Sequence, residues 1–168
     1  MAERKTIRKW FWVWDFDKEE RWLNEMALAG WLLVNVGLCS YTFERCEPGE
    51  YAVRLEMHPA DEAYIAFMQE TGAQYIGRVI QWIYFSKKTE DGPFEIFSDL
   101  DSRINHLDRI ARVLRVIGIA NLLIGAMNVF SYSRAGVVNL LCATLLMYGL
   151  GRIQGKKEAL INDRQLRE

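Results

Sequence analysis

The sequence predicts an α+β domain that is followed by two helices able to cross a membrane. Residues 8–88 repeat one pattern of strand, helix, strand and strand, with corresponding positions about 42 residues apart. Residues 116–130 and 135–151 are apolar runs without Asp, Glu, Lys or Arg. Chains with both features combine a folded domain and a hydrophobic anchor. At 168 residues the chain has room for one of each.

The first unit begins with residues 9–15, where aromatic residues alternate in a run of high β propensity, so we expect a strand. Asp17 follows as a helix cap, with acidic residues near the positive end of the helix dipole. Gly30 supplies the left-handed residue that stops this helix. The remaining elements of the unit are strands 31–36 and 40–46, a turn at 47–50 and strand 51–57.

The second unit repeats these signals. Pro59-Ala60-Asp61 opens its helix and Gly72 ends it, strands follow at 75–81 and 82–87, and residues 89–93 form an exposed loop. In the repeat, Phe11 and Val13 correspond to Val53 and Leu55, and Trp22 corresponds to Tyr64. The predicted fold is therefore a duplicated β-α-β-β unit that forms one antiparallel sheet with two helices on one face, as in ferredoxin-like folds.

Residues 98–115 predict a helix, starting at Ser98 or Asp99, that continues into the first apolar run. With neighbouring apolar residues each run reaches about 17–20 residues, enough to span a bilayer. Four arginines precede the pair, five cations follow it, and the connecting loop carries only Arg134. The positive-inside rule therefore places both termini in the cytoplasm. The predicted organisation is a cytoplasmic domain 1–97, a juxtamembrane helix 98–115, a transmembrane hairpin 116–151 and a basic cytoplasmic tail 152–168 of a multi-pass cell-membrane protein.

Small and amide residues recur along one face of each apolar run, at steps of three and four. Small residues allow helix backbones to approach, and an Asn in lipid seeks a partner across the contact. A polar pathway is the alternative, but pathways usually contain an ionisable residue. A buried hairpin of a soluble protein is the alternative for the whole stretch. The predicted helix-packing residues are Gly118, Asn121, Gly125, Asn128, Gly136, Asn139 and Ala143.

Charge and motif searches narrow the function. The net charge is −1, so nucleic acid is not an expected partner. The three cysteines and two histidines lack metal-ligand spacing, and no nucleophile or phosphate-loop motif occurs. The acids at 15–20 suit a helix dipole better than a cation site. We therefore expect no catalytic residues, no metal and no cofactor, and favour a non-enzymatic protein.

A binding surface is predicted from side-chain parity. If Val53 and Leu55 lie under the helices, the opposite sheet face carries large aromatic residues with Arg54 and Glu56, and water should not cover it. A second subunit, the juxtamembrane helix or lipid interface, or an apolar ligand could cover this face. The predicted surface comprises Trp10, Trp12, Trp14, Arg54, Glu56, Trp82 and Tyr84.

Several motifs in order resemble a known family. They are Trp14-Asp15, the acidic helix 17–27, Gly30-Trp31, Tyr41-Thr42-Phe43-Glu44, Pro48-Gly49-Glu50-Tyr51, Gly72 and the strand 82–85. Together with the terminal hairpin, they resemble domain-of-unknown-function family 2812 over about residues 5–100, although Ala73 stands where the family usually has Trp. The resemblance implies a bacterial membrane protein and a role in envelope stress or drug response, and it supplies no activity.

These observations favour a membrane-anchored cytoplasmic interaction or sensor module. Its expected partners are the bilayer and either a second copy of the chain or another membrane or cytoplasmic protein. The alternative is a small-molecule-binding protein, either an enzyme or a transport accessory, that acts on a hydrophobic compound. An enzyme needs a pocket with convergent titratable groups, whereas an interaction module needs only a large apolar contact face.

Overall fold

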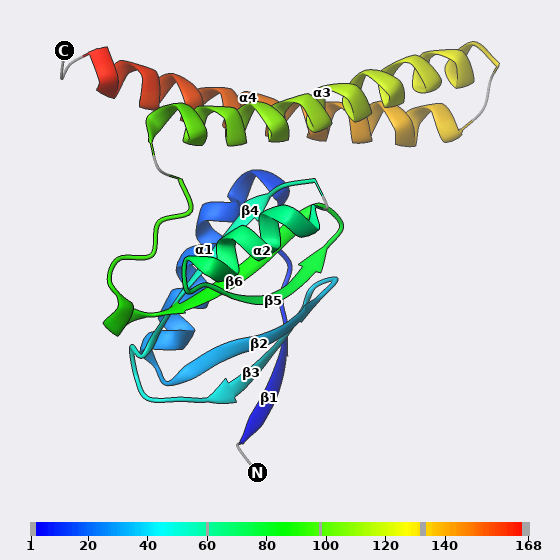
Figure 1. Ribbon diagram of the computed structural model, residues 1–168. Coiled ribbons are helices and arrows are strands. Elements are labelled where there is room, and N and C mark those ends of the chain that lie inside the picture. Colours follow the sequence, from blue (N-terminus) through cyan, green and yellow to red (C-terminus); the bar gives the residue numbers. More distant parts are fainter. Residues whose placement is uncertain (1–2, 60, 98, 132–133, 166–168) are drawn as a thin grey trace. The chain divides into compact units, whose positions relative to one another are not determined.

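The computed structural model describes residues 3–59, 61–97, 99–131 and 134–165, and divides the chain into two compact units (Figure 1). Unit 1 is Met1–Ser98 and unit 2 is Asp99–Glu168. The predicted helix start at Ser98, Ala60 of the predicted helix opening, the loop residues 132–133 and the end of the basic tail lie outside the described residues.

Unit 1 contains the order strand, helix, strand, strand twice. The first half is β1 (Arg4–Arg8), α1 (Phe16–Leu28), β2 (Trp31–Gly37) and β3 (Ser40–Arg45). The second half is β4 (Tyr51–Met57), α2 (Glu62–Glu70), β5 (Gln74–Val79) and β6 (Trp82–Lys88), followed by a 3-10 turn, Thr89–Asp91. For six of these elements, α1 and β2 to β6, both ends lie within two residues of the predicted ends. As predicted, Asp61 stands at the start of α2, where its side chain accepts a hydrogen bond from the Ala63 backbone N–H.

The strands form two antiparallel sheets, in the orders β1-β3-β2 and β4-β6-β5, rather than the single predicted sheet. The edge strands β2 and β5 lie close together without sharing a ladder, and a Cβ on Gly77 would stand 3.1 Å from Val36 Cγ1. Each of these strands contains a register shift, between Leu33 and Asn35 and between Tyr75 and Gly77. A bulge leaves a residue unpaired and increases the local twist, which separates the two facing edges into different sheets.

Helix α1 occupies the other edge of the second sheet, along β4. The Asn24 amide donates to the Val53 carbonyl oxygen at 2.8 Å and accepts from the Val53 N–H at 2.9 Å. Glu20 Oε2 accepts from the Leu55 N–H at 3.2 Å. These side chains pair backbone groups that a neighbouring strand would otherwise pair.

The prediction of a strand at residues 9–15 is wrong. The first strand is β1, whose ladder with β3 runs from Arg4 opposite Glu44 to Arg8 opposite Ser40. The Lys9 N–H then bonds to the Cys39 carbonyl in the β2–β3 turn, one residue before β3 begins. Residues 9–12 therefore have no strand beside them, and Val13–Asp15 form one 3-10 turn. β1 is short, charged and at a sheet edge, so its sequence pattern is weak.

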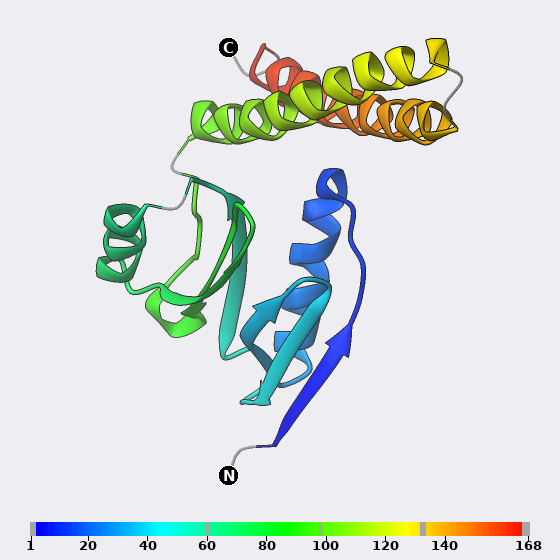
Figure 2. The same cartoon turned by 90° about the vertical axis from the view of Figure 1, so that its right-hand side faces the viewer.

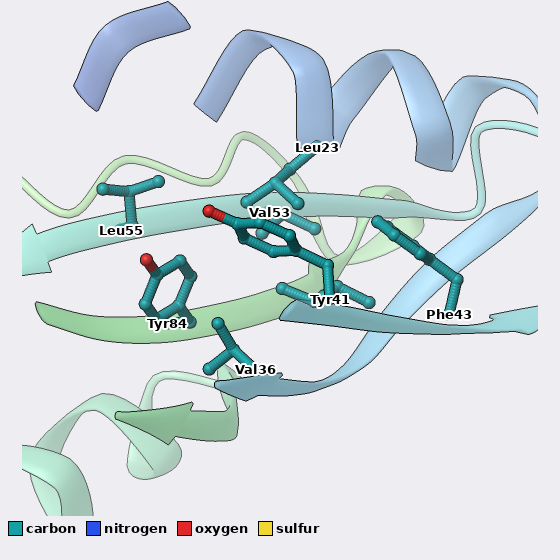
Figure 3. Packing of buried hydrophobic residues seen from close by; sticks show 8 residues of the cluster. Leu23, Val36, Tyr41, Phe43, Val53, Leu55 and Tyr84 are labelled. Atoms are coloured by element: carbon teal, nitrogen blue, oxygen red, sulfur yellow. The ribbon is translucent and has the colours of Figure 1, made fainter. Parts of the chain in front are cut away.

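The two helices cover opposite faces of the β4-β6-β5 sheet, not the same face as predicted (Figure 2). Leu23 of α1 packs in a cluster with Val53 and Tyr84, drawn in Figure 3. Met68 of α2 packs in a second cluster with Ile83. Since neighbouring residues of a strand point to opposite faces, Ile83 and Tyr84 assign the two clusters to the two sides of β6.

Unit 2 is an antiparallel pair of 31-residue helices, α3 (Leu100–Phe130) and α4 (Ala135–Gln165). Asp99 and Ser102 form a capping box at the start of α3. As predicted, α3 runs unbroken from its charged segment into the apolar run, and α4 continues as a helix through the predicted basic tail to Gln165. The two helices face each other in one continuous register, with ion pairs toward the chain termini and close packing toward the connecting loop. The facing pairs are Asp101–Arg164, Asp108–Lys157, Gly118–Met147, Gly125–Leu140 and Val129–Gly136.

Candidate functional site

Three tryptophans precede α1 and form an ordered group that we name the aromatic ridge: Trp10, Trp12 and Trp14. The Trp12 and Trp14 rings stack with centroids 5.0 Å apart and planes 5° apart, and Trp10 meets Trp12 edge-on at 5.4 Å. Trp14 is buried at 4 % exposure, whereas Trp12 is 41 % and Trp10 60 % exposed. The ridge is thus anchored at one end and presents two indoles to the outside of the domain.

The ridge has no counterpart in the second half of unit 1. Thr6 lies opposite Thr42 in the first sheet, and Leu55 lies opposite Tyr84 in the second. Since Thr42 and Tyr84 are 42 residues apart and therefore equivalent in the repeat, Thr6 of β1 corresponds to Leu55 of β4. The predicted match of Phe11 and Val13 with Val53 and Leu55 is therefore wrong. Seven residues, 9–15, join β1 to α1, whereas four, 58–61, join β4 to α2. The ridge lies in the longer connection, outside the elements that the two halves share.

The other predicted surface residues do not join the ridge on one open face. Tyr84 is buried in the core cluster with Leu23. Glu56 is buried on the opposite side of the sheet, where its Oε2 accepts from the Tyr64 hydroxyl at 2.6 Å. Arg54 forms an ion pair with Glu20 at 3.6 Å. Trp82 packs on Phe16, with ring centroids 5.6 Å apart. Helices on both faces of this sheet leave no helix-free side for such a surface.

A buried carboxyl group lies at the centre of the domain, where the sequence predicted only an acidic helix start. Glu19 Oε1 accepts hydrogen bonds from the hydroxyls of Tyr41, at 2.8 Å, and Tyr84, at 2.7 Å. Figure 3 shows both hydroxyls directed toward α1 from β3 and β6. The helical spacing of Glu19 and Leu23 is the sequence signal for this burial, because residues four apart share one face.

Burial controls the protonation of this group. Loss of solvent raises the pKa of Glu19 above its ordinary value of 4.5, and the two phenol donors oppose this rise. Burial, followed by the nearby Glu19 charge and the hydrogen bond to it, raises the pKa of Tyr84 and of Tyr41. Glu19 is 8 % exposed. This arrangement links α1 to strands of both sheets, which is a structural role.

The predicted helix-packing residues are distributed along α3 and α4. Gly118, Gly125, Gly136 and Ala143 are buried between the helices, and Asn128 and Asn139 are half-buried. The Asn121 side chain donates to the Ile117 carbonyl of its own helix at 2.9 Å, rather than across the contact. The seam continues beyond the apolar runs. On α3 its alternating steps of four and three residues are Leu107, Ala111, Leu114, Gly118, Asn121, Gly125 and Asn128.

Metal binding finds no support in the described part of the chain, where no three His, Cys, Asp or Glu side chains converge. The three cysteines are free thiols, with Cys39 and Cys46 half-buried in unit 1 and Cys142 exposed on α4.

Comparison with known proteins identifies the family and nothing finer. The chain matches no curated protein and no solved structure. One family model, described as a protein of unknown function, matches residues 15–119, which cover the domain from the end of the aromatic ridge to the middle of α3. The match begins at Asp15, so Trp10 and Trp12 precede it. The motifs that resembled this family in the sequence lie within or next to that range, and the chain belongs to the family of proteins of unknown function DUF2812.

Proposed function

We propose that this protein is a membrane-anchored interaction module, in which the α3–α4 pair crosses the bilayer and holds the α+β domain at the inner surface. The observation that carries the proposal is the direction of the apolar side chains. Along the described residues of the helix pair, every large apolar side chain that is exposed lies between Val116 and Tyr148. Beyond these limits the exposed residues of the pair are charged, polar or small.

Packing explains why these side chains face outward. Gly118, Gly125 and Gly136 occupy the contact, so the bulky residues between them point away from the partner helix. In the most apolar 18-residue windows of α3 and α4, only 17 % and 28 % of the residues are buried. Core helices of soluble proteins are mostly buried, and an apolar surface of this extent is unfavourable in water. Lipid is the environment that matches it.

Charge supports the orientation. Arg109, Arg112 and Arg115 precede the apolar part of α3, and Arg152 and Lys156 follow that of α4. Among the described residues of the connecting loop, Arg134 is the only cation. An excess of Lys and Arg marks the cytoplasmic side of membrane helices, so both ends of the pair face the cytoplasm in this proposal.

We also infer that the two halves of unit 1 descend from one duplicated unit. The register shifts in β2 and β5 fall at equivalent positions, and the helices end at Gly30 and Gly72, with φ of 79° and 88°. Both sheets have the same strand order. The predicted ferredoxin-like arrangement would require the halves to share one sheet, and the two-sheet form suggests a variant of it.

Cysteine labelling tests the anchor and its orientation. In a background with Cys39→Ser, Cys46→Ser and Cys142→Ala, one variant carries Arg134→Cys and the other Asn162→Cys, both at exposed positions. A membrane-impermeant maleimide should label the first variant in intact cells and the second only after permeabilisation. The reverse pattern would contradict the orientation. Release of the protein by alkaline carbonate would contradict the anchor itself.

A further inference from the structure

The aromatic ridge is ordered, exposed and outside the elements that the two halves of the domain share, so it is a candidate binding surface. We propose that the ridge, with Arg8 and Lys9, docks on the anionic lipid headgroups of the membrane that holds the helix pair. This inference rests on the proposed membrane anchor and adds a second, peripheral contact to it. The binding partner is therefore a lipid surface and not a soluble ligand.

The chemistry of the ridge fits the interfacial layer of a bilayer. Indole rings combine a large apolar face with an N–H donor, and Trp concentrates at the level of the headgroups. Trp10 and Trp12 are exposed and are followed by Val13, which is also exposed. Stacking on the buried Trp14 holds Trp12 in place before any contact is made. A surface that is already ordered loses little conformational entropy on binding.

Two cations directly precede the exposed indoles in the sequence. They are Arg8 and Lys9, and both are exposed. The Lys9 ammonium lies 4.4 Å from the centre of the Trp22 ring and 5.0 Å from that of Phe11, the residue between Trp10 and Trp12. This segment thus carries positive charge together with exposed indoles, which complements a surface that is apolar inside and negatively charged outside. Basic residues near the inner leaflet are attracted to its anionic lipids.

The ridge lies at the end of the domain from which the chain continues to the helix pair. In both cartoon views, the beginning of α1 and the segment that ends at Phe97 share one end of unit 1 (Figures 1 and 2). Ile96 still packs against the second cluster of the domain, and α3 starts at Leu100. Only a few residues therefore separate the folded domain from the helix.

The chain itself keeps the domain within reach of the lipid surface in the proposed arrangement. The charged part of α3, residues 100–115, continues the helix by about 24 Å before the apolar part begins at Val116. A surface tethered within such a distance meets the lipid at a high effective concentration, which favours lipid over a partner that must diffuse to the ridge.

Tryptophan quenching in nanodiscs tests the proposal on the full chain. All six tryptophans lie in the α+β domain, so their fluorescence reports on that domain alone. The probe is phosphatidylcholine brominated in the upper acyl chain, with or without phosphatidylglycerol. We expect quenching that grows with phosphatidylglycerol, and the Trp10→Phe/Trp12→Phe variant should lose that increase. The Trp31→Phe variant, which removes an indole elsewhere, should keep it.

A charge pair of variants isolates the electrostatic part. Arg8→Gln/Lys9→Gln should abolish the response to phosphatidylglycerol, whereas Arg21→Gln/Arg78→Gln removes two other exposed charges and should preserve it. Circular dichroism checks that all variants are folded. Equal quenching of the wild type and the Trp10→Phe/Trp12→Phe variant would overturn the proposal. A second outcome would also overturn it. If acrylamide cannot reach the indoles in discs that hold two copies of the chain, and brominated lipid does not quench them, the ridge is covered by a second copy and not by lipid.

The outcomes separate this proposal from the anchor. Co-elution of every variant with the discs supports membrane insertion of α3 and α4 independently of the ridge. Failure of the wild type to co-elute would count against the proposed function. Co-elution without quenching would count against the ridge contact alone.

Discussion

Glu19 shows how one side chain joins three elements of the domain. Its carboxyl group leaves water at a cost that hydrogen bonds and proton uptake offset. Tyr41 supplies one from β3 and Tyr84 supplies the other from β6, so α1 is tied to both sheets through a single oxygen atom. The same group makes the stability of the domain depend on pH.

We predict that Glu19→Gln flattens the pH dependence of stability. The raised pKa means that folded Glu19 keeps its proton at pH values where the unfolded chain, with an ordinary value of 4.5, has lost it. The stability that Glu19 contributes is therefore fully present below pH 4.5 and is lost as pH rises through the folded pKa. Melting temperatures from mildly acidic to neutral pH should fall more steeply for the wild type than for Glu19→Gln.

A tyrosine variant provides the control for this prediction. Tyr84→Phe removes one donor to the buried carboxylate, so it should cost about 1–3 kcal/mol at neutral pH and raise the pKa of Glu19 further. Its melting curve should then depend on pH more strongly than that of the wild type. Parallel pH profiles for all three proteins would contradict the prediction, because they would show that folding leaves the pKa of Glu19 unchanged.

At the scale of elements, the seam between α3 and α4 changes character along its length. In the apolar half it contains Gly118, Gly125 and Gly136, and in the charged half it contains Leu107 and Leu114. Small residues let the backbones approach where no water drives association. In the proposed membrane arrangement the charged half lies outside the lipid, where burial of larger apolar residues from water stabilises the pair.

We predict that Gly136→Ala weakens the helix pair. The new methyl group would stand 2.8 Å from the Val129 backbone nitrogen and 3.0 Å from the Gly125 carbonyl oxygen, and backbone atoms cannot move aside cheaply. Overpacking of this kind costs about 1–3 kcal/mol. Gly151→Ala is the matched control, since nothing lies within 4 Å of its Cβ position and Ala favours a helix by about 1 kcal/mol. Unfolding in mixed detergent micelles should rank the control above the wild type and Gly136→Ala below it.

The elements differ in how well local sequence determines them. Capping residues, glycine stops and turn chemistry are local, so α1, α2 and the strands from β2 to β6 could be predicted. β1 could not, because the aromatic alternation of residues 9–15 satisfies a strand pattern while the ladder depends on where β3 begins. Alternation within each strand was predicted correctly, but the matching of faces between strands was wrong, because Tyr84 lies opposite Leu55 and Ile83 lies opposite Glu56 in the β4–β6 ladder. Cross-strand register and helix coverage depend on tertiary packing rather than on local sequence. This is why Glu56 and Tyr84, expected together in the open, are buried on opposite sides.

Of the candidate site, the sequence predicted the group of tryptophans but not the buried Glu19. Clustering of Trp10, Trp12 and Trp14 was expected from their alternation, and the structure groups them although they are not in a strand. Glu19 was missed because an acid at a helix start is usually solvated. A test of whether each polar residue falls on the apolar stripe of its helix would have found it.

At the scale of the whole molecule, the chain consists of two units with separate cores. The two apolar clusters of unit 1 draw on residues from Ile7 to Ile96 and on none from the helix pair. The family match extends from Asp15 to Ile119, so what relatives share includes the start of α3 and not only the domain. The core of the domain and the proposed anchor thus belong to different parts of one chain.

We predict that residues 1–98 fold without the helix pair. The fragment retains both clusters, and all of the exposed apolar side chains of α3 and α4 are removed with unit 2. It should remain soluble without detergent and unfold cooperatively, with the same near-ultraviolet circular dichroism as the domain in the full chain. Aggregation, or loss of the near-ultraviolet signal, would show that the domain depends on the hairpin for its core.

The unbroken register of α3 and α4 has a mechanical consequence. Facing pairs continue from Val129–Gly136 at the loop to Asp101–Arg164 at the open end, so the two helices behave as one stiff rod. When a thinner bilayer tilts one end of a rod, the other end swings through the same angle. In the proposed membrane arrangement, lipid thickness would then set the tilt of the charged end of the helix pair.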